Sequence, residues 1–293
     1  MDSVNETPTF DCRFLDESYF DQLLEKFLKA FSDYSLQFEF DATKFRNHIN
    51  LNAIDLNRTV GCFDHGEMIG FSLNGFGTWD GKRTVYDAGT GVVPAMRRMG
   101  ASVAMFEMMV PIFGSEGYEQ FLLEVITGNE PAVNLYKKLG FEIQRELLFL
   151  EAPGRLEPDP EMNRDVEIRR ISAEQLTAMT EGWDGNPSWQ NSNDAIKRSE
   201  ALKTILGAFL NGEPAGYIVF SNSLGRVAQF FVHRPFRQRG VGTRLLAEME
   251  ANTREGARMQ VINIDSSMNR SVEFFEKRGF RRVLSQYEMV MPL

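Results

Sequence analysis

Apolar positions follow helical and strand spacings in the same order twice along the chain. In the first half, residues 16–31 have helical spacing, while 58–63, 68–76 and 84–93 have the composition and turns of strands. A helix over 97–109, a strand over 120–126 and a helix over 131–139 are predicted next. The second half repeats this with strands at 204–210, 215–221 and 226–233, a helix over 241–254, a strand over 259–264 and a helix over 270–278. Each half is therefore expected to form a mixed α/β sheet.

Short segments of the two halves also match in sequence. Gly66–Phe71 (GEMIGF) pairs with Gly212–Tyr217 (GEPAGY), and Leu135–Phe141 (LYKKLGF) pairs with Phe274–Phe280 (FFEKRGF). The matching segments lie about 140 residues apart, so a whole domain is repeated rather than a short solenoid unit. The stretch 153–164, with three prolines and one glycine, reads as a linker between domains at 1–152 and 165–293.

Charge and composition exclude several classes of protein. The chain has 32 basic and 41 acidic residues, a net charge of −9 and no basic run, so no nucleic-acid partner is expected. No apolar stretch is long enough to span a bilayer, and the first residues lack the features of a signal peptide. Two cysteines indicate no disulfide framework, which favours a cytoplasmic location. The three histidines are scattered, so no metal site is predicted.

The strongest motif is Arg237-Gln238-Arg239-Gly240-Val241-Gly242-Thr243, between a predicted strand and a predicted helix. Glycines allow the backbone to approach a ligand closely, and the N–H groups at a helix start bind anions such as a pyrophosphate. The third glycine of a dinucleotide fingerprint and the Gly-Lys-Ser/Thr of a P-loop are both absent. The first half has a weaker copy of the turn, with Arg97, Arg98, Met99, Gly100, Ala101 and Ser102.

This Arg-x-x-Gly-x-Gly turn resembles motif A of the GNAT acetyltransferase superfamily, and Asn129–Phe141 (NEPAVNLYKKLGF) resembles its motif B. The resemblance covers both halves. It implies two tandem GNAT-like domains, each a mixed, mostly antiparallel sheet with splayed parallel central strands flanked by helices. It also implies acetyl-CoA as the cofactor, with its pyrophosphate on the turn amides and its pantetheine between the splayed strands. The implied coenzyme contacts are Val92, Val93, Arg97, Arg98, Met99, Gly100, Ala101, Ser102, Asn129, Phe231, Val232, Arg237, Gln238, Arg239, Gly240, Val241, Gly242 and Thr243.

The resemblance further implies that an acceptor amine attacks the thioester directly. Tyr136 stands at the family's general-acid position, and Asp87 and Glu124 on neighbouring strands are candidate bases. In the second half Phe275 replaces the tyrosine and Asn263 stands opposite Glu124, which favours catalysis in the first half. A coenzyme A sensor, or a second half that only imitates a dimer partner, remains an alternative.

The acceptor itself is not encoded in any motif. The loop after the first helix usually helps to form the acceptor pocket in this superfamily, which makes Asp33 and Tyr34 candidate substrate contacts. A small-molecule amine or a peptide N-terminus is expected as the acceptor, and a monomer as the oligomeric state. Aromatic residues beside Asp184, in the segment 183–189, offer a similar environment in the second half.

Overall fold

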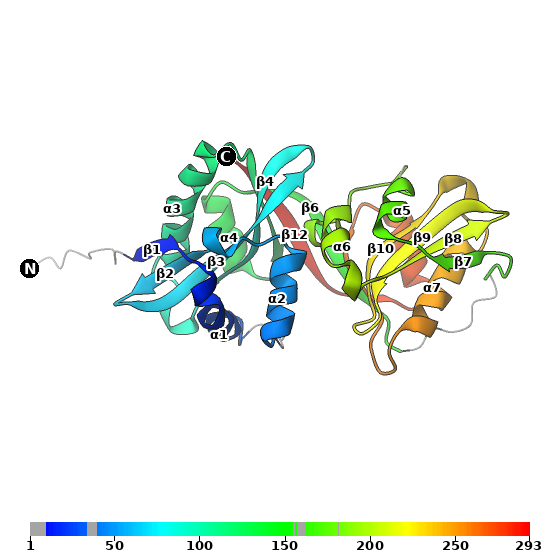
Figure 1. Cartoon of the computed structure of the whole chain (residues 1–293), viewed down its shortest axis with the longest axis horizontal. Coiled ribbons are helices and arrows are strands. Elements are labelled where there is room, and N and C mark those ends of the chain that lie inside the picture. The colour runs from blue at the N-terminus through cyan, green and yellow to red at the C-terminus, as the bar shows by residue number, and fades with distance from the viewer. Residues whose placement is uncertain (1–9, 34–39, 155, 157–161, 181) are drawn as a thin grey trace, which may run out of the picture. The chain divides into compact units, whose positions relative to one another are not determined.

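The computed structural model describes residues 10–33, 40–154, 156, 162–180 and 182–293 (Figure 1). The chain forms two compact units. Unit 1 comprises Met1–Glu124, Pro131–Glu142 and Met289–Leu293, and unit 2 comprises Val125–Glu130 and Ile143–Glu288. Half of the predicted linker at 153–164 lies outside the described residues, so its position stays a prediction.

Unit 1 contains most of the elements of the first sequence repeat. They are β1 (Asp11–Phe14), α1 (Phe20–Ala30), α2 (Ala42–Leu51), β2 (Val60–Asp64), β3 (Glu67–Trp79), β4 (Lys82–Val92), α3 (Ala101–Ser115), β5 (Gln120–Ile126) and α4 (Glu130–Lys138). The strand order is β1-β2-β3-β4-β5, followed by the end of β12 (Arg281–Pro292). Leu293 N–H donates to the Glu119 carbonyl at 3.0 Å, which ties the last residues of the chain into this unit.

Helices cover both faces of the unit 1 sheet. Phe27 of α1 and Phe45 of α2 pack with Phe71 and Leu73 of β3 on one face. Asn74, the next residue of β3, points to the other face and contacts Met109 of α3, with 3.6 Å between Nδ2 and Sδ. Each fully buried Phe or Leu contributes about 1.5–3 kcal/mol, so these two apolar layers hold the sheet in place.

Unit 2 is built in the same way. It contains β6 (Glu142–Glu151), β7 (Glu167–Arg170), α5 (Ala173–Ala178), α6 (Asn193–Arg198), β8 (Thr204–Leu210), β9 (Glu213–Ser221), β10 (Arg226–Val232), α7 (Val241–Asn252), β11 (Gln260–Asp265), α8 (Asn269–Glu276) and most of β12. The strand order is β12-β6-β11-β10-β9-β8-β7. The last strand of the first repeat, β6, thus pairs with β11 in unit 2.

The central strands of each unit part after a short parallel ladder. β4 pairs with β5 only from Thr84–Gln120 to Asp87–Leu123, although β4 continues to Val92. β10 pairs with β11 only at Arg226–Gln260 and Val227–Val261, although it continues to Val232. The expected mixed, mostly antiparallel α/β architecture is confirmed, including the parallel strands that diverge.

The first residues of the predicted helix at 97–109 are not helical. Residues 97–100 form a turn in which Arg98 and Gly100 have positive φ, and α3 begins only at Ala101. The helix continues to Ser115, and Pro111 lies inside it without ending it.

Candidate functional site

The turn before α3 has the shape of an anion cradle. Arg98 has φ +64°, and Gly100, the residue that caps α3, has φ +96°. A side chain added at Gly100 would meet no described atom within 4 Å, so the space above this residue is open. Since the first N–H groups of a helix have no partner within the helix, the turn presents donors to that space. The arrangement suits a phosphate group.

The turn before α7 repeats this backbone. Gln238 has φ +57° and Gly240, which caps α7, has φ +73°. The next glycine of the motif has a packing role, because a Cβ at Gly242 would lie 3.1 Å from the rings of both Phe230 and Phe274. Those rings stack with centroids 5.0 Å apart. In unit 1 Ser102 stands at the corresponding position of the turn.

The leading arginine of each turn points away from the cradle. Arg97 Nε donates to the Val92 carbonyl at 3.2 Å, and its guanidinium makes a bidentate pair with Asp33 at 2.6 and 2.8 Å. Arg237 Nε makes the same contact with the Val232 carbonyl at 2.9 Å, and Arg237 pairs with Asp184. These arginines therefore connect the turns to the loops after α1 and α5.

Those contacts bear on two sequence predictions. Asp33 already has a guanidinium partner, so a cationic acceptor at Asp33 would compete with Arg97. Tyr34 lies outside the described residues. Of the backbone groups predicted to hold pantetheine, the Val93 N–H donates to the Ile69 carbonyl at 2.9 Å within the sheet. Asn129 lies in the turn between β5 and α4.

Tyr136 and Asp87 come together where β4 and β5 part. The Tyr136 hydroxyl donates to Oδ2 of Asp87 at 3.2 Å, and the two side chains are buried with only 8% and 6% of their surfaces exposed. Asp87 also accepts from the Thr90 hydroxyl at 2.8 Å and from the Gly89 N–H at 3.0 Å. Burial raises the pKa of Asp87 to about 6, against the lowering effect of these three donors.

A buried histidine holds the backbone beside Asp87. The β3–β4 register shifts at Ala88, which is a β-bulge, and Nε2 of His48 lies 3.1 Å from the Ala88 carbonyl. Nδ1 of His48 lies 3.1 Å from Nδ2 of Asn52, which sets Nε2 as the protonated nitrogen. Burial lowers the pKa of His48 to about 4, so its ring is neutral at pH 7 and donates to the bulge.

We expect Asp87→Asn to change the pH dependence of stability. A carboxyl with a raised folded-state pKa binds its proton more tightly in the folded state, so its contribution is present below pH 4 and is lost as pH rises through 6. The difference in the free energy of unfolding between the variant and wild type should therefore rise, in favour of the variant, by up to about 3 kcal/mol from pH 4 to pH 7. Urea denaturation at both pH values measures this gain.

The control for this measurement is Asp80→Asn, at an exposed aspartate between β3 and β4. His48 is present in all three proteins, so its opposite contribution over the same pH range cancels from the difference. A difference between Asp87→Asn and wild type that stays constant with pH would contradict the assignment of a raised pKa.

Glu124 lies on the other face of the sheet from Tyr136. Its Oε2 accepts the hydroxyl of Tyr86, the neighbour of Asp87 in β4. Because successive residues of a strand point to opposite faces, Tyr86 and Glu124 lie on the face covered by α1 and α2, whereas Asp87 faces α4. The two candidate bases are therefore separated. The sequence analysis did not predict three residues of this region: Tyr86, Thr90 and His48. The i+3 spacing of Asp87 and Thr90 was a usable signal for the contact between those two side chains.

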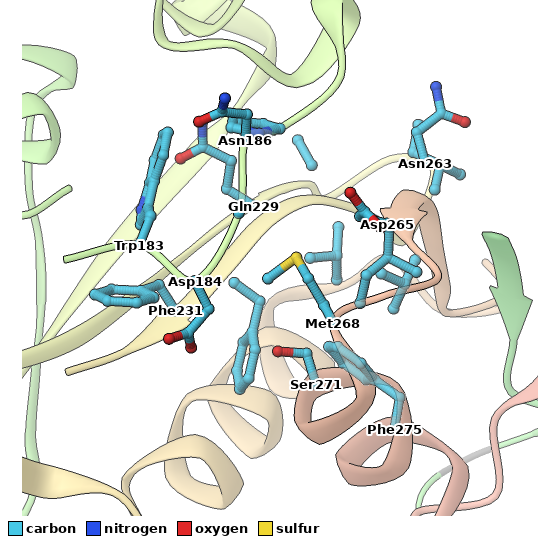
Figure 2. A pocket seen from close by; sticks show the side chains of 18 of the residues that line it. Trp183, Asp184, Asn186, Gln229, Phe231, Asn263, Asp265, Met268, Ser271 and Phe275 are labelled. Atoms are coloured by element: carbon cyan, nitrogen blue, oxygen red, sulfur yellow. The ribbon is translucent and has the colours of Figure 1, made fainter. Parts of the chain in front are cut away.

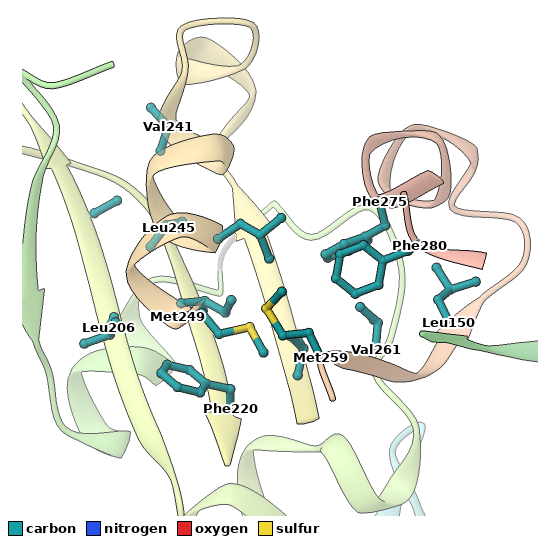
Figure 3. Close-up of a cluster of buried hydrophobic side chains, with 14 of the residues drawn as sticks. Leu150, Leu206, Phe220, Val241, Leu245, Met249, Met259, Val261, Phe275 and Phe280 are labelled. Carbon is teal, nitrogen blue, oxygen red and sulfur yellow. The ribbon is translucent and has the colours of Figure 1, made fainter. Parts of the chain in front are cut away.

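The corresponding region of unit 2 is an open cleft between β10 and β11 (Figure 2). Its walls include Trp183, Tyr217, Gln229, Phe231 and Met268. Phe275, at the position of Tyr136, lies at the edge of the cleft and also belongs to the apolar core with Val241, Leu245 and Phe280 (Figure 3). The cleft thus lacks the hydroxyl that unit 1 has at this point.

The residues that the structure describes contain no group of three or more His, Cys, Asp or Glu side chains placed to share a metal ion. None of the helices in the described part of the chain combines the length and the apolar character needed to cross a membrane.

Comparison with known proteins agrees with this arrangement. A family model described as "Acetyltransferase (GNAT) family" matches residues 18–141, and one described as "Acetyltransferase (GNAT) domain" matches residues 174–290. The chain therefore belongs to the GNAT acetyltransferases, with two such domains in tandem. It is an acyltransferase by family, and members of this family generally use acetyl-CoA.

Solved structures share the fold over nearly the whole chain. A GCN5-related N-acetyltransferase from Sphaerobacter thermophilus is 16% identical with a TM-score of 0.73, over 97% of this chain and 95% of that one. A tandem GNAT protein from the clavulanic acid biosynthesis pathway is 13% identical with a TM-score of 0.72, over 97% and 98%. A GCN5-related N-acetyltransferase from Kribbella flavida is 16% identical with a TM-score of 0.63, over 98% and 72%.

Proposed function

We propose that this protein transfers an acetyl group from acetyl-CoA to a primary amine, and that the reaction takes place in unit 1. One observation carries the proposal: the Tyr136 hydroxyl and the Asp87 carboxyl meet where the parallel strands β4 and β5 separate. A gap between strands admits an extended chain, and a buried hydroxyl at its start can donate a proton. The acceptor is a small-molecule amine or a peptide N-terminus.

The residues of unit 1 fit coenzyme A. The open space above Gly100 and the donors at the start of α3 suit a pyrophosphate. Beyond Asp87, β4 has no partner strand on the β5 side among the described residues, which leaves room there for an extended ligand, although the Val92 carbonyl already accepts from Arg97. When bound, acetyl-CoA supplies the activated acetyl thioester.

The side chains of unit 1 divide the proton transfers between the two faces of the sheet. Glu124, on the face covered by α1 and α2, takes a proton from the acceptor amine as its nitrogen forms the new bond to the acetyl carbon. Tyr136, on the α4 face, gives its proton to the sulfur as the carbon–sulfur bond breaks. Asp87 positions the tyrosine hydroxyl through the 3.2 Å hydrogen bond and does not itself contact the acceptor. This assignment favours Glu124 over Asp87 as the base.

A thiol-release assay tests this function directly. The purified chain is incubated with acetyl-CoA and a panel of primary amines and peptides, and free thiol is measured with mass detection of the acetylated acceptor. Amine-dependent thiol release that Tyr136→Phe suppresses would support the proposal. Release that is independent of every amine, or that yields only acetylated alcohols or thiols, would contradict it.

We expect valine at Gly100 or Gly240 to abolish coenzyme A binding at the altered turn. A β-branched residue is strained at φ +96° or +73°, and its side chain would occupy the space required by the phosphates. Calorimetry on folded variants measures the number of sites and their affinity. Gly66→Val and Gly212→Val are matched controls, because both residues have a similar positive φ in hairpin turns outside the cradles. Unchanged affinity in Gly100→Val or Gly240→Val would refute the cradle at that turn.

Unit 2 supports a second function. Phe275 cannot donate a proton, and the carboxylates that line its cleft, Asp184 and Asp265, are paired with arginines. A unit that binds coenzyme A without reacting fits these residues. In the same calorimetric experiment, two molecules of coenzyme A per chain would favour this sensor role, and one would favour a second unit that only imitates a dimer partner.

A further inference from the structure

The cleft of unit 2 is lined by residues from both faces of β10. Phe231 and Tyr217 pack with residues of α5 and α6, and Trp183 and Ala228 pack against the same cluster. Val227, Phe230 and Val232 pack instead with α7 and α8, next to the turn that is proposed to hold the coenzyme phosphates. Gln229 donates to residues of the segment 191–193 and so belongs to the α5 and α6 face.

Gln229 presents a buried hydrogen-bond acceptor to this cleft. Its side chain is only 6% exposed, and its Nε2 donates to the Asn191 carbonyl at 2.7 Å and to Oδ1 of Asn193 at 3.1 Å. These two acceptors fix which end of the amide is nitrogen. Oε1 receives no hydrogen bond from any described residue, and Figure 2 shows it directed toward Trp183. A buried acceptor without a donor is costly, and a ligand N–H would recover that cost.

The charges around the cleft cancel one another. Asp184 pairs with Arg234 at 3.1 Å and with Arg237, and Asp265 pairs with Arg145 at 3.2 Å. Arg145 is also paired with Glu288 at 2.7 Å. No carboxylate among the described lining residues is left without a cationic partner, so the cleft offers an ammonium ion no counter-charge.

Most of the remaining lining residues are aromatic or apolar, and the polar ones among them are Asn186, Asn263 and Ser271. Trp183 donates its indole N–H to the Tyr217 hydroxyl, and the two rings contribute contact surface. Phe231 is 5% exposed, and Met268 adds a flexible apolar side chain. Such walls favour an apolar or aromatic group beside the buried acceptor of Gln229.

We propose that this cleft binds, without reacting, an uncharged secondary amide attached to an apolar or aromatic group, whose N–H donates to Oε1 of Gln229. N-acylated amines belong to this chemical class. The binding site stands on the contacts above, whereas its interpretation as a site for the product of acetyl transfer rests on the function proposed for unit 1. Under that function, unit 2 would recognise the neutral product in preference to the cationic amine.

Calorimetry with three probes tests the proposal on the intact chain. N-benzylacetamide represents the amide, the benzylammonium ion represents the amine, and coenzyme A represents the other source of secondary amides. Wild type should bind N-benzylacetamide at least about tenfold more tightly than benzylammonium, because only the amide matches the neutral cleft. Gln229→Leu should weaken amide binding about tenfold, and Gln144→Leu, at an exposed glutamine of β6, should leave it unchanged.

A second variant keeps the test decisive if Gln229→Leu does not fold. Ser271→Phe at the edge of the cleft fills it without touching the contacts of Gln229, and should also remove amide binding. Equal affinity for amide and ammonium, unaltered binding in a folded Gln229→Leu or Ser271→Phe, or displacement of the amide by coenzyme A would overturn the proposal. Thiol release, measured on the same samples, reports separately on unit 1. If no thiol is released while amide binding still depends on Gln229, the proposed function is contradicted and the binding site in unit 2 is still supported.

Discussion

Tyr136→Phe is expected to lower kcat by ~10²–10⁴-fold and to leave coenzyme A affinity little changed. An unperturbed tyrosine has a pKa of about 10, so a hydroxyl of this type keeps its proton at neutral pH and can give it to a thiolate as that forms. The ring packs edge-on against Phe106 and Phe141, with centroids 6.0 and 5.5 Å away, and phenylalanine would preserve those contacts. Asp87 would retain Thr90 and Gly89 as donors, so the variant should fold.

The control for this variant is Tyr118→Phe. Tyr118 also uses its hydroxyl, which accepts from Arg58 at 3.3 Å, but it lies before the start of β5, away from Asp87. Its variant should therefore show the cost of a lost tyrosine hydroxyl without loss of turnover. If kcat of folded Tyr136→Phe stays within about threefold of wild type, well below the range for acid catalysis, Tyr136 is a core residue and the reaction must be sought in unit 2.

Glu124→Gln is expected to reduce kcat by a similar ~10²–10⁴-fold, because the amide cannot take a proton from the acceptor amine. Glutamine can still accept the Tyr86 hydroxyl, so the sheet around it should be unaltered. The kcat/KM profile should separate this effect from a loss of structure: its acid limb reports both the free amine and the essential base of the free enzyme, and the contribution of the base should disappear in the variant. Initial rates across a series of pH values with one acceptor measure it.

Glu119→Gln, at the residue directly before β5, provides the comparison. Glu119 accepts the Arg83 N–H at 2.9 Å in the sheet, a structural contact that glutamine can also make. Turnover near that of wild type in Glu124→Gln, with the acid limb retained, would remove Glu124 from the mechanism. Asp87 would then become the candidate base, despite its buried contact with Tyr136.

The architecture was predictable because both halves carry the same order of periodicities. The strands at 68–76 and 204–210 and the helices near 131–139 and 241–254 appear close to their predicted bounds. β6 and β12 were not predicted. Their residues follow the two Gly-Phe pairs in equivalent positions. Local sequence does not determine which unit each strand joins, because that depends on pairing with strands far away in the sequence.

The site was predictable at the level of residue types and only partly in its contacts. The sequence indicates both Asp87 and Tyr136 as site residues, one as a base and one as an acid. It does not show their mutual hydrogen bond, which forms beside the bulge at Ala88. The arginines of the two turns were expected to face the coenzyme. Sequence spacing could not show that Arg97 and Arg237 instead reach the carbonyls of Val92 and Val232, because their direction depends on the positive φ of the residues that follow them.

The placement of β6 in unit 2 and of the end of β12 in unit 1 has a consequence for biosynthesis. Unit 1 includes Met289–Leu293, so its sheet cannot be completed until the last residues of this sequence have been translated. By then unit 2, which includes residues 143–151 from the first repeat, has all of its own segments. Unit 1, although its sheet begins with earlier segments than that of unit 2, is thus completed later, and a truncation before Met289 would damage the unit proposed to carry out the chemistry.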